Sequence, residues 1–171
     1  ALSRNAFQIL RAGHRQPEWV LKFARVRRYS ERFDNDERGL QLAQAAGGCV
    51  AAHAPRLVGR FEVDSLHASL ETFAVGRRLR DVLVTPGDRT TKLRLIERIA
   101  GWIVDLGRRT QAPADAMRPE RQRLRVDVVP SWSHLGVRTE LVDELPQLPA
   151  VTQHNDLGSW NIVVEGEEFT V

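Results

Sequence analysis

The sequence has one cysteine, two lysines and no long apolar run, and each scarcity excludes a class of protein. The single cysteine, Cys49, excludes an internal disulfide framework and fits a reducing compartment. No stretch approaches the roughly 18 consecutive apolar residues of a membrane-spanning helix, and the first residues do not form a secretory signal. We therefore expect a soluble, cytoplasmic protein without a membrane partner.

The two lysines, Lys22 and Lys92, stand out because the other 23 of the 25 basic residues are arginines. The net charge of +3 would suit a nucleic-acid ligand, but the arginines alternate with acidic residues instead of clustering with aromatic ones. The densest basic tract, Arg118–Arg125, is typical of a solvated face. We expect no nucleic-acid partner.

Two common enzyme signatures are also missing. No Gly-x-Ser-x-Gly occurs, so nothing supports serine hydrolase chemistry. Four histidines lack both the spacing and the paired cysteine or glutamate ligands of a metal site: His14, His53, His67 and His134.

The first part of the chain is predicted to be rich in strands. Two hairpins are predicted, from strands over residues 6–10 with 19–24 and over 55–59 with 65–73. Between them, residues 34–46 are predicted to form a helix that Asp34 or Asn35 caps and that Gly47-Gly48 ends.

The second part is predicted to be mainly helical. Residues 91–109 carry the strongest helical pattern, with Leu93, Ile96, Ala100 and Ile103 at helical spacing and Leu95, Ile99 and Leu106 beside them. The sequence also predicts short helical segments over 80–83 and 138–145, an Arg- and Pro-rich loop over 112–130, and a final hairpin of strands over 162–164 and 169–171. The order predicts an α+β protein of two lobes with a cleft between them.

The residues with the clearest chemistry lie in Gln153–Val171, where Asp156 precedes Asn161 by five positions in a polar loop that leads into an apolar strand. Phosphoryl transfer needs a carboxylate that orients the attacking hydroxyl and accepts its proton. It also needs oxygen ligands for Mg²⁺ on the phosphates. Asp156 and Asn161 can serve these two tasks, and His154 is expected behind the loop, where it would bond to the backbone.

This loop resembles that of the aminoglycoside phosphotransferase/choline kinase-like family, relatives of the protein kinases. The matching residues are His154, Asp156, Leu157, Asn161 and Ile162. The family usually has Gly where this sequence has Asn155, and Asn is the residue that most easily replaces a Gly of positive φ. The resemblance implies a two-lobed, protein kinase-like fold, with ATP (or alternatively GTP) and Mg²⁺ as cofactors.

The same loop favours a small-molecule acceptor over a protein. Protein kinases place Arg before the catalytic Asp and Lys two positions after it. This sequence has Asn155 and Gly158 there. We therefore expect phosphorylation of a hydroxyl on a small molecule.

A kinase also needs a strand lysine that holds the nucleotide phosphates and a helix glutamate that positions it. Lys22 lies inside an apolar strand, and a compact ammonium suits a phosphate. Glu37 is the expected partner, with Asp36 as the competitor.

The resemblance adds three expectations about the nucleotide site. Glu71–Gly76 would be the hinge, with the backbone at Thr72 and Phe73 bonding the adenine edge. Ser3 and Asn5 would belong to a turn over the phosphates. A further metal-binding Asp would follow Val171.

The expected organisation is an N-terminal nucleotide-binding lobe over 1–70 that lacks its first strand, the hinge over 71–76, and a partial C-terminal lobe over 77–171 with the catalytic loop at 153–161. We accordingly expect a fragment that is inactive by itself. The alternative function is an inactive, pseudokinase-like nucleotide-binding or scaffold protein, which Asn155 and the weak phosphate turn would suit.

Overall fold

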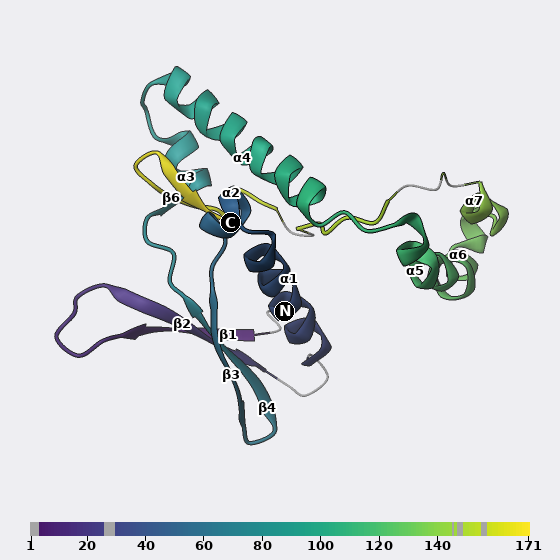
Figure 1. Cartoon of the computed structure of the whole chain (residues 1–171), viewed down its shortest axis with the longest axis horizontal. Helices are drawn as coiled ribbons and strands as arrows, with labels where there is room; N and C mark the ends of the chain where they lie inside the picture. Colours follow the sequence, from purple (N-terminus) through teal and green to yellow (C-terminus); the bar gives the residue numbers. More distant parts are fainter. Residues whose placement is uncertain (1–3, 26–29, 145, 147–148, 155–156) are drawn as a thin grey trace. The chain divides into compact units, whose positions relative to one another are not determined.

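The computed structural model describes residues 4–25, 30–144, 146, 149–154 and 157–171 (Figure 1). The protein has an α+β fold, and its contacts divide it into two compact units. The first unit is Ala1–Leu106 with Gln153–Val171, and the second is Gly107–Thr152. The expected hinge over 71–76 falls inside the first unit.

An antiparallel sheet of four strands forms the beginning of the first unit. In sheet order the strands are β1 (Arg4–Leu10), β2 (Pro17–Ala24), β4 (Leu66–Thr72) and β3 (Leu57–Val63). Both predicted hairpins are confirmed, because β1 pairs with β2 and β3 pairs with β4. The second hairpin turns at Asp64 and Ser65, whose φ angles are 50° and 62°.

The strand register decides which side chains share a face of the sheet. Lys22 lies opposite Ser69, and Val20 lies opposite Glu71. Side chains of directly paired residues are on the same face and alternate along each strand, so these four residues share one face. Helix α1 (Ser30–Ala46) packs on this face, where the ring of Phe33 stacks on His67.

Helix α1 begins four residues before the predicted start. Asp34 therefore lies within the helix and does not cap it, and its carboxylate instead bonds to Arg60 of β3. Gly47, with a φ of 65°, separates α1 from a short helix that the sequence did not predict, α2 (Gly48–Ala52).

The apolar core of the first unit is built around α4 (Arg89–Arg109). Its buried residues are Leu95, Ile99, Trp102 and Leu106, one face of the helix at helical spacing. The predicted helix is confirmed, but of the two sets of apolar residues named in it, Leu93, Ile96 and Ile103 are exposed, and the set beside them is buried. Apolar residues lie on both faces of α4, and the face with Trp102 is buried, where its indole Nε1 donates to the carbonyl of Val50 at 3.2 Å.

A second sheet of three strands lies beside this core. It consists of β5 (Arg77–Arg78), β6 (Val163–Glu165) and β7 (Glu168–Thr170), and β6–β7 is the predicted final hairpin. The predicted helical turn is α3 (Leu79–Val84), directly after β5. Gly76 passes so close to β6 that a Cβ there would lie 2.2 Å from the Val164 carbonyl oxygen, and its φ is 133°. Only glycine fits this position.

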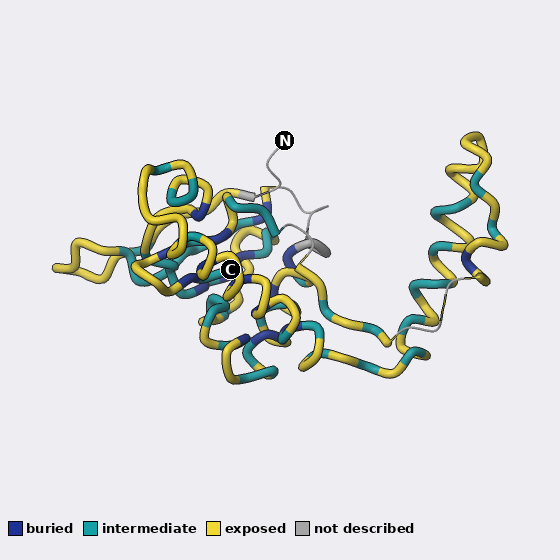
Figure 2. Tube along the Cα trace, turned by 90° about the horizontal axis from the view of Figure 1, so that it is seen from above, coloured by how far each residue is buried: buried dark blue, intermediate teal, exposed yellow. Residues whose placement is uncertain are grey.

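The second unit consists of short helical segments, so the predicted loop over 112–130 was wrong. They are η2 (Ala114–Met117), α5 (Arg118–Arg123), the π-helical η3 (Leu124–Val128), α6 (Val129–Ser131), η4 (Ser133–Leu135) and α7 (Glu140–Asp143). Pro119 and Pro130 lie in the first turns of α5 and α6, where proline is compatible with a helix. Most described residues of this unit are exposed or intermediate (Figure 2). Val142 is the single buried hydrophobic residue among its described positions.

None of the helices in the described ranges combines the length and the apolar character that crossing a bilayer requires.

We predict that Trp102→Ala lowers the free energy of unfolding by about 3–5 kcal/mol, because it removes a fully buried indole from the core. Ile103→Ala on the exposed face of the same helix is the matched control and should cost less than about 1 kcal/mol. Urea unfolding of both variants gives the comparison. Equal losses would show that the two faces of α4 are wrongly assigned.

Candidate functional site

The ammonium of Lys22 and the carboxylate of Glu71 form an ion pair on the two central strands. Lys22 Nζ lies 2.5 Å from Glu71 Oε2. Glu71 is buried, whereas the Lys22 side chain keeps 24% of its surface exposed. The hydroxyl of Ser69 donates to the other oxygen, Glu71 Oε1, at 3.3 Å. Both carboxylate oxygens are therefore bound, and the ammonium is left accessible from one side.

The expected ion pair between Lys22 and Glu37 is not the one present. Glu37 of α1 is buried and pairs with Arg60 of β3, whose Nε lies 2.5 Å from Glu37 Oε2. The physical reason is the register, because it places Glu71 diagonally across from Lys22 on the adjacent strand. The competitor, Asp36, is exposed on α1.

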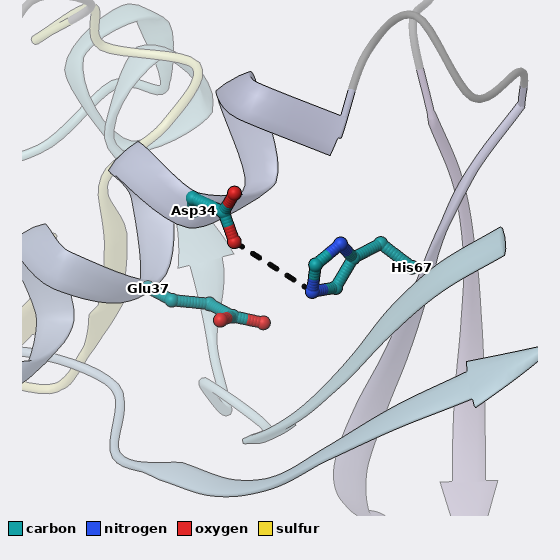
Figure 3. A group of neighbouring side chains, drawn as sticks. All are labelled: Asp34, Glu37 and His67. Carbon is teal, nitrogen blue, oxygen red and sulfur yellow. Dashed lines mark ion pairs between the residues drawn. The ribbon is translucent and has the colours of Figure 1, made fainter. Parts of the chain in front are cut away.

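Glu37 belongs to a cluster with Asp34 and His67 (Figure 3). Their ligand atoms lie within 4.8 Å of one another, a spacing that a metal ion could bridge. The guanidinium of Arg60 already occupies this position: its Nη2 lies 2.9 Å from Asp34 Oδ1 and 3.2 Å from His67 Nε2. The cluster therefore has a positive partner in its own chain.

Burial raises the pKa of Glu37 above its ordinary value of 4.5, and the positive charge of Arg60 opposes the rise. Neither oxygen of this carboxylate accepts a hydrogen bond of normal geometry within the described part of the chain. The contact with Arg60 is thus a charge interaction without good hydrogen-bond alignment.

The expected adenine-binding backbone is already hydrogen-bonded within the protein. The amide of Thr72 donates to the Arg56 carbonyl at 2.9 Å, and the amide of Phe73 donates to the Glu18 carbonyl at 2.9 Å. Neither amide is available to donate to a ligand in this structure. Glu71 and Thr72, expected in the hinge, are the last residues of β4.

The structure does not bring Asn5 toward Lys22. Asn5 pairs with Phe23, the neighbour of Lys22, so its side chain is on the opposite face of the sheet. Asn5 is exposed there, near the edge of the sheet. Ser3, the other residue expected over the phosphates, lies outside the described residues.

The structure describes the predicted catalytic loop, residues 153–161, on both sides of its central pair. Asp156 and Asn155 lie outside the described residues, so the roles predicted for them stay predictions. After them, the amide of Asn161 donates to the Gly158 carbonyl at 2.9 Å, which closes a turn. The carbonyls of Ser159 and Ile162 accept from the amides of Arg80 and Leu79, respectively.

Two further details of the loop concern its predicted roles. Asn161 is exposed, and its amide oxygen is a ligand type that Mg²⁺ prefers. His154 is also exposed, which is contrary to the expectation that it lies behind the loop. The loop is held by main-chain bonds to α3 and by Leu157 and Ile162, which pack on the apolar core.

The hairpin after the loop is tied to α2 through His53. The imidazole stacks on the ring of Phe169 at 4.0 Å with the planes nearly parallel, and its Nδ1 donates to the Phe169 carbonyl at 2.7 Å. The amide of Val171 donates back to the His53 carbonyl at 2.8 Å. The polypeptide between α1 and β3 therefore fixes the hairpin that follows the loop.

The second lysine of the chain has a structural role. Lys92 Nζ donates to the carbonyls of Leu83 and Thr85 at the end of α3. A shallow hollow beside it is lined by Val82, Leu95 and the Gly166 turn, and it includes none of the predicted site residues. Lys22 is the lysine whose surroundings suit ligand binding.

Sequence reasoning missed the pairing partners in this region. Arg60 was not singled out, His67 was set aside, and Glu71 was assigned to the hinge through its backbone. The signal that could have found the Lys22–Glu71 pair is period-2 alternation, because Ser69 and Glu71 face the same way on β4. Using it required the register of β2 against β4, which the sequence does not state.

Searches against models of known protein families and against curated proteins find no match.

We predict that Lys22→Met lowers the free energy of unfolding by about 3 kcal/mol, because it leaves the buried Glu71 carboxylate without its cation. The double variant Lys22→Met with Glu71→Gln removes both charges and should recover most of the loss. Urea unfolding of Lys22→Met, Glu71→Gln and the double variant gives the three losses in free energy of unfolding that a double-mutant cycle compares. If the loss in the double variant equals the sum of the two single losses, Lys22 and Glu71 do not stabilise each other.

A second prediction follows from the raised pKa of Glu37. Its contribution to stability is full below pH 4.5 and is lost as the pH rises through the raised pKa, since the folded state holds the proton more tightly. Glu37→Gln removes this dependence, so the variant should gain stability relative to the wild type as the pH rises above 4.5.

Unfolding in urea at pH 4 and pH 7 tests this sign. Glu62→Gln, which removes an exposed carboxylate from the same sheet, controls for net charge. A relative loss of stability by Glu37→Gln at pH 7 would show that its pairing with Arg60 outweighs the cost of burial.

Proposed function

We propose that the protein is an ATP-dependent phosphotransferase with a two-lobe, protein kinase-like fold that phosphorylates a hydroxyl of a small molecule. The observation that carries the proposal is the accessible ammonium of Lys22, held by a buried carboxylate on the central strands of the sheet. A fixed, partly exposed cation on a rigid strand suits the α- and β-phosphates of a nucleotide.

The second support is the loop over 153–161. It joins the sequence features of a phosphoryl-transfer loop to a strand–turn–strand that follows it, as the resemblance implies. Main-chain bonds to Leu79 and Arg80 hold the described part of the loop, which is the preorganisation that transfer chemistry requires.

In the proposed reaction the acceptor hydroxyl oxygen forms a bond to the γ-phosphorus of ATP. The bond from that phosphorus to the oxygen bridging the β-phosphorus breaks, and ADP leaves. Asp156 orients the hydroxyl and takes its proton, while Lys22 neutralises charge on the phosphates. Asn161 would supply an oxygen ligand to Mg²⁺, whose chemistry is to neutralise charge on the phosphate oxygens.

A second candidate is an inactive nucleotide-binding or scaffold protein of the same fold. The observation that favours it is the occupied hinge backbone, because the amides of Thr72 and Phe73 both bond to carbonyls of the protein. In this case the loop would keep its shape, but the protein would not transfer phosphate.

We predict that Asp156→Asn lowers phosphate transfer by roughly 100- to 10,000-fold, because it removes the proton acceptor, and leaves nucleotide affinity within about threefold of the wild type. The assay uses the full-length gene product with Mg²⁺, ATP or GTP, and a panel of small alcohols including sugars, choline-like alcohols and aminoglycosides. Calorimetric titration measures nucleotide affinity separately.

Nucleotide binding without transfer to any acceptor, and without nucleotide hydrolysis, would favour the inactive candidate. A wild-type protein that neither binds nor hydrolyses Mg·ATP or Mg·GTP would overturn the proposal.

A further inference from the structure

The contacts of Lys22 lead to a further inference, which rests on the proposed function. We propose that Glu71 of β4 is the positioning residue for Lys22, in place of a carboxylate from α1. In the arrangement that the sequence predicts, the helix supplies the partner, and the strand residue serves only through its backbone. The side-chain geometry reverses these assignments.

The first argument is that the Glu71 carboxylate is held in one orientation. Its Oε2 lies 2.5 Å from Lys22 Nζ, and its Oε1 accepts from Ser69. The residue is 3% exposed, so water does not compete for either oxygen. A carboxylate fixed at both oxygens restricts where its ammonium partner can lie.

The second argument is that the carboxylates of α1 are committed elsewhere. Glu37 and Asp34 both contact the guanidinium of Arg60, at 2.5 Å and 2.9 Å. A move of Glu37 to Lys22 would separate it from Arg60 and place a second negative charge beside Glu71. The Coulomb energy of two buried carboxylates opposes that arrangement.

The third argument concerns the geometry left for the phosphates. An ammonium has three N–H donors, and Glu71 is its one carboxylate partner among the described residues. The remaining donors can bond to phosphate oxygens on the exposed side of the side chain. Lys22 and Glu71 come from adjacent strands joined by a continuous hydrogen-bond ladder, so their spacing is fixed by backbone and not by the placement of a helix.

The test compares Glu71→Gln and Glu37→Gln in the full-length gene product. Glu71→Gln should raise the KM and the Kd for Mg·ATP about tenfold or more, because the ammonium would lose the orientation in which it donates charge-assisted hydrogen bonds to the phosphates. It should leave the KM for the acceptor unchanged. Glu37→Gln should change the affinity for Mg·ATP less than about twofold, and Glu62→Gln serves as the control for charge.

A second readout does not depend on turnover. Acylation of the Lys22 amine, followed by mass spectrometry of the peptide, should be faster in Glu71→Gln than in the wild type and unchanged in Glu37→Gln. Ser69→Ala is a milder variant that keeps both charges, and it should shift both readouts in the same direction by less. Circular dichroism and urea unfolding verify that each variant is folded.

The outcomes separate the two proposals. If wild-type protein binds no Mg·ATP, the proposed function fails and the role of Glu71 fails with it. A second outcome would overturn the inference and leave the proposed function standing. In it the wild type binds Mg·ATP, Glu37→Gln lowers the affinity for Mg·ATP and speeds the acylation of Lys22, and Glu71→Gln changes neither.

Discussion

The first unit depends on balancing two buried carboxylates that lie between the sheet and α1. Glu37 and Glu71 are each almost fully buried, and a buried carboxylate is costly unless a cation lies beside it. The sequence places one cation near each, Arg60 for Glu37 and Lys22 for Glu71. The register of β2, β3 and β4 must keep both pairs together, because a shift by one residue would turn each cation to the other face.

The loop over 153–161 is held by a different kind of interaction. Leu157 within the loop and Ile162 directly after it join the apolar core around α4, and Phe169 of the following hairpin stacks against His53. Charge balance thus positions Lys22, whereas apolar packing and main-chain bonds position the loop. The two parts of the proposed site can respond separately to substitution, because the forces that hold them are of different origin.

The sequence predicted the elements whose pattern is local. The strands of the first two hairpins, α4 and the final hairpin follow from alternation, turn residues and helical spacing over neighbouring residues. It could not choose the buried face of α4, since Leu93 and Leu95 are equally apolar and the choice depends on what packs against the helix. In the structure α2, α3 and the hairpin of β6 and β7 all contribute to the core on the face of Trp102. The segment 112–130 is rich in Arg and Pro and weakly patterned, which predicts a loop, whereas Pro119 and Pro130 lie in the first turns of helices.

The pairing of charges was beyond the sequence for the same reason. Whether Lys22 meets Glu37 or Glu71 is decided by strand register and by the competing attraction of Arg60, and both are long-range properties. The sequence did identify Lys22, Glu37 and Glu71 as residues of one region. It assigned Glu37 to Lys22 because kinases have a helix glutamate after the strand lysine in the chain. This order does not determine which side chains lie diagonally across two paired strands.

Arg60 is, in effect, a counterion that is covalently attached to the protein. A dissolved cation reaches the cluster of Asp34, Glu37 and His67 at its bulk concentration, whereas the guanidinium is present at the high effective concentration of an intramolecular group. The cluster therefore has its positive charge whether or not a dissolved cation binds there. The junction between α1 and the sheet should for this reason keep its geometry when metal cations are removed from the solution.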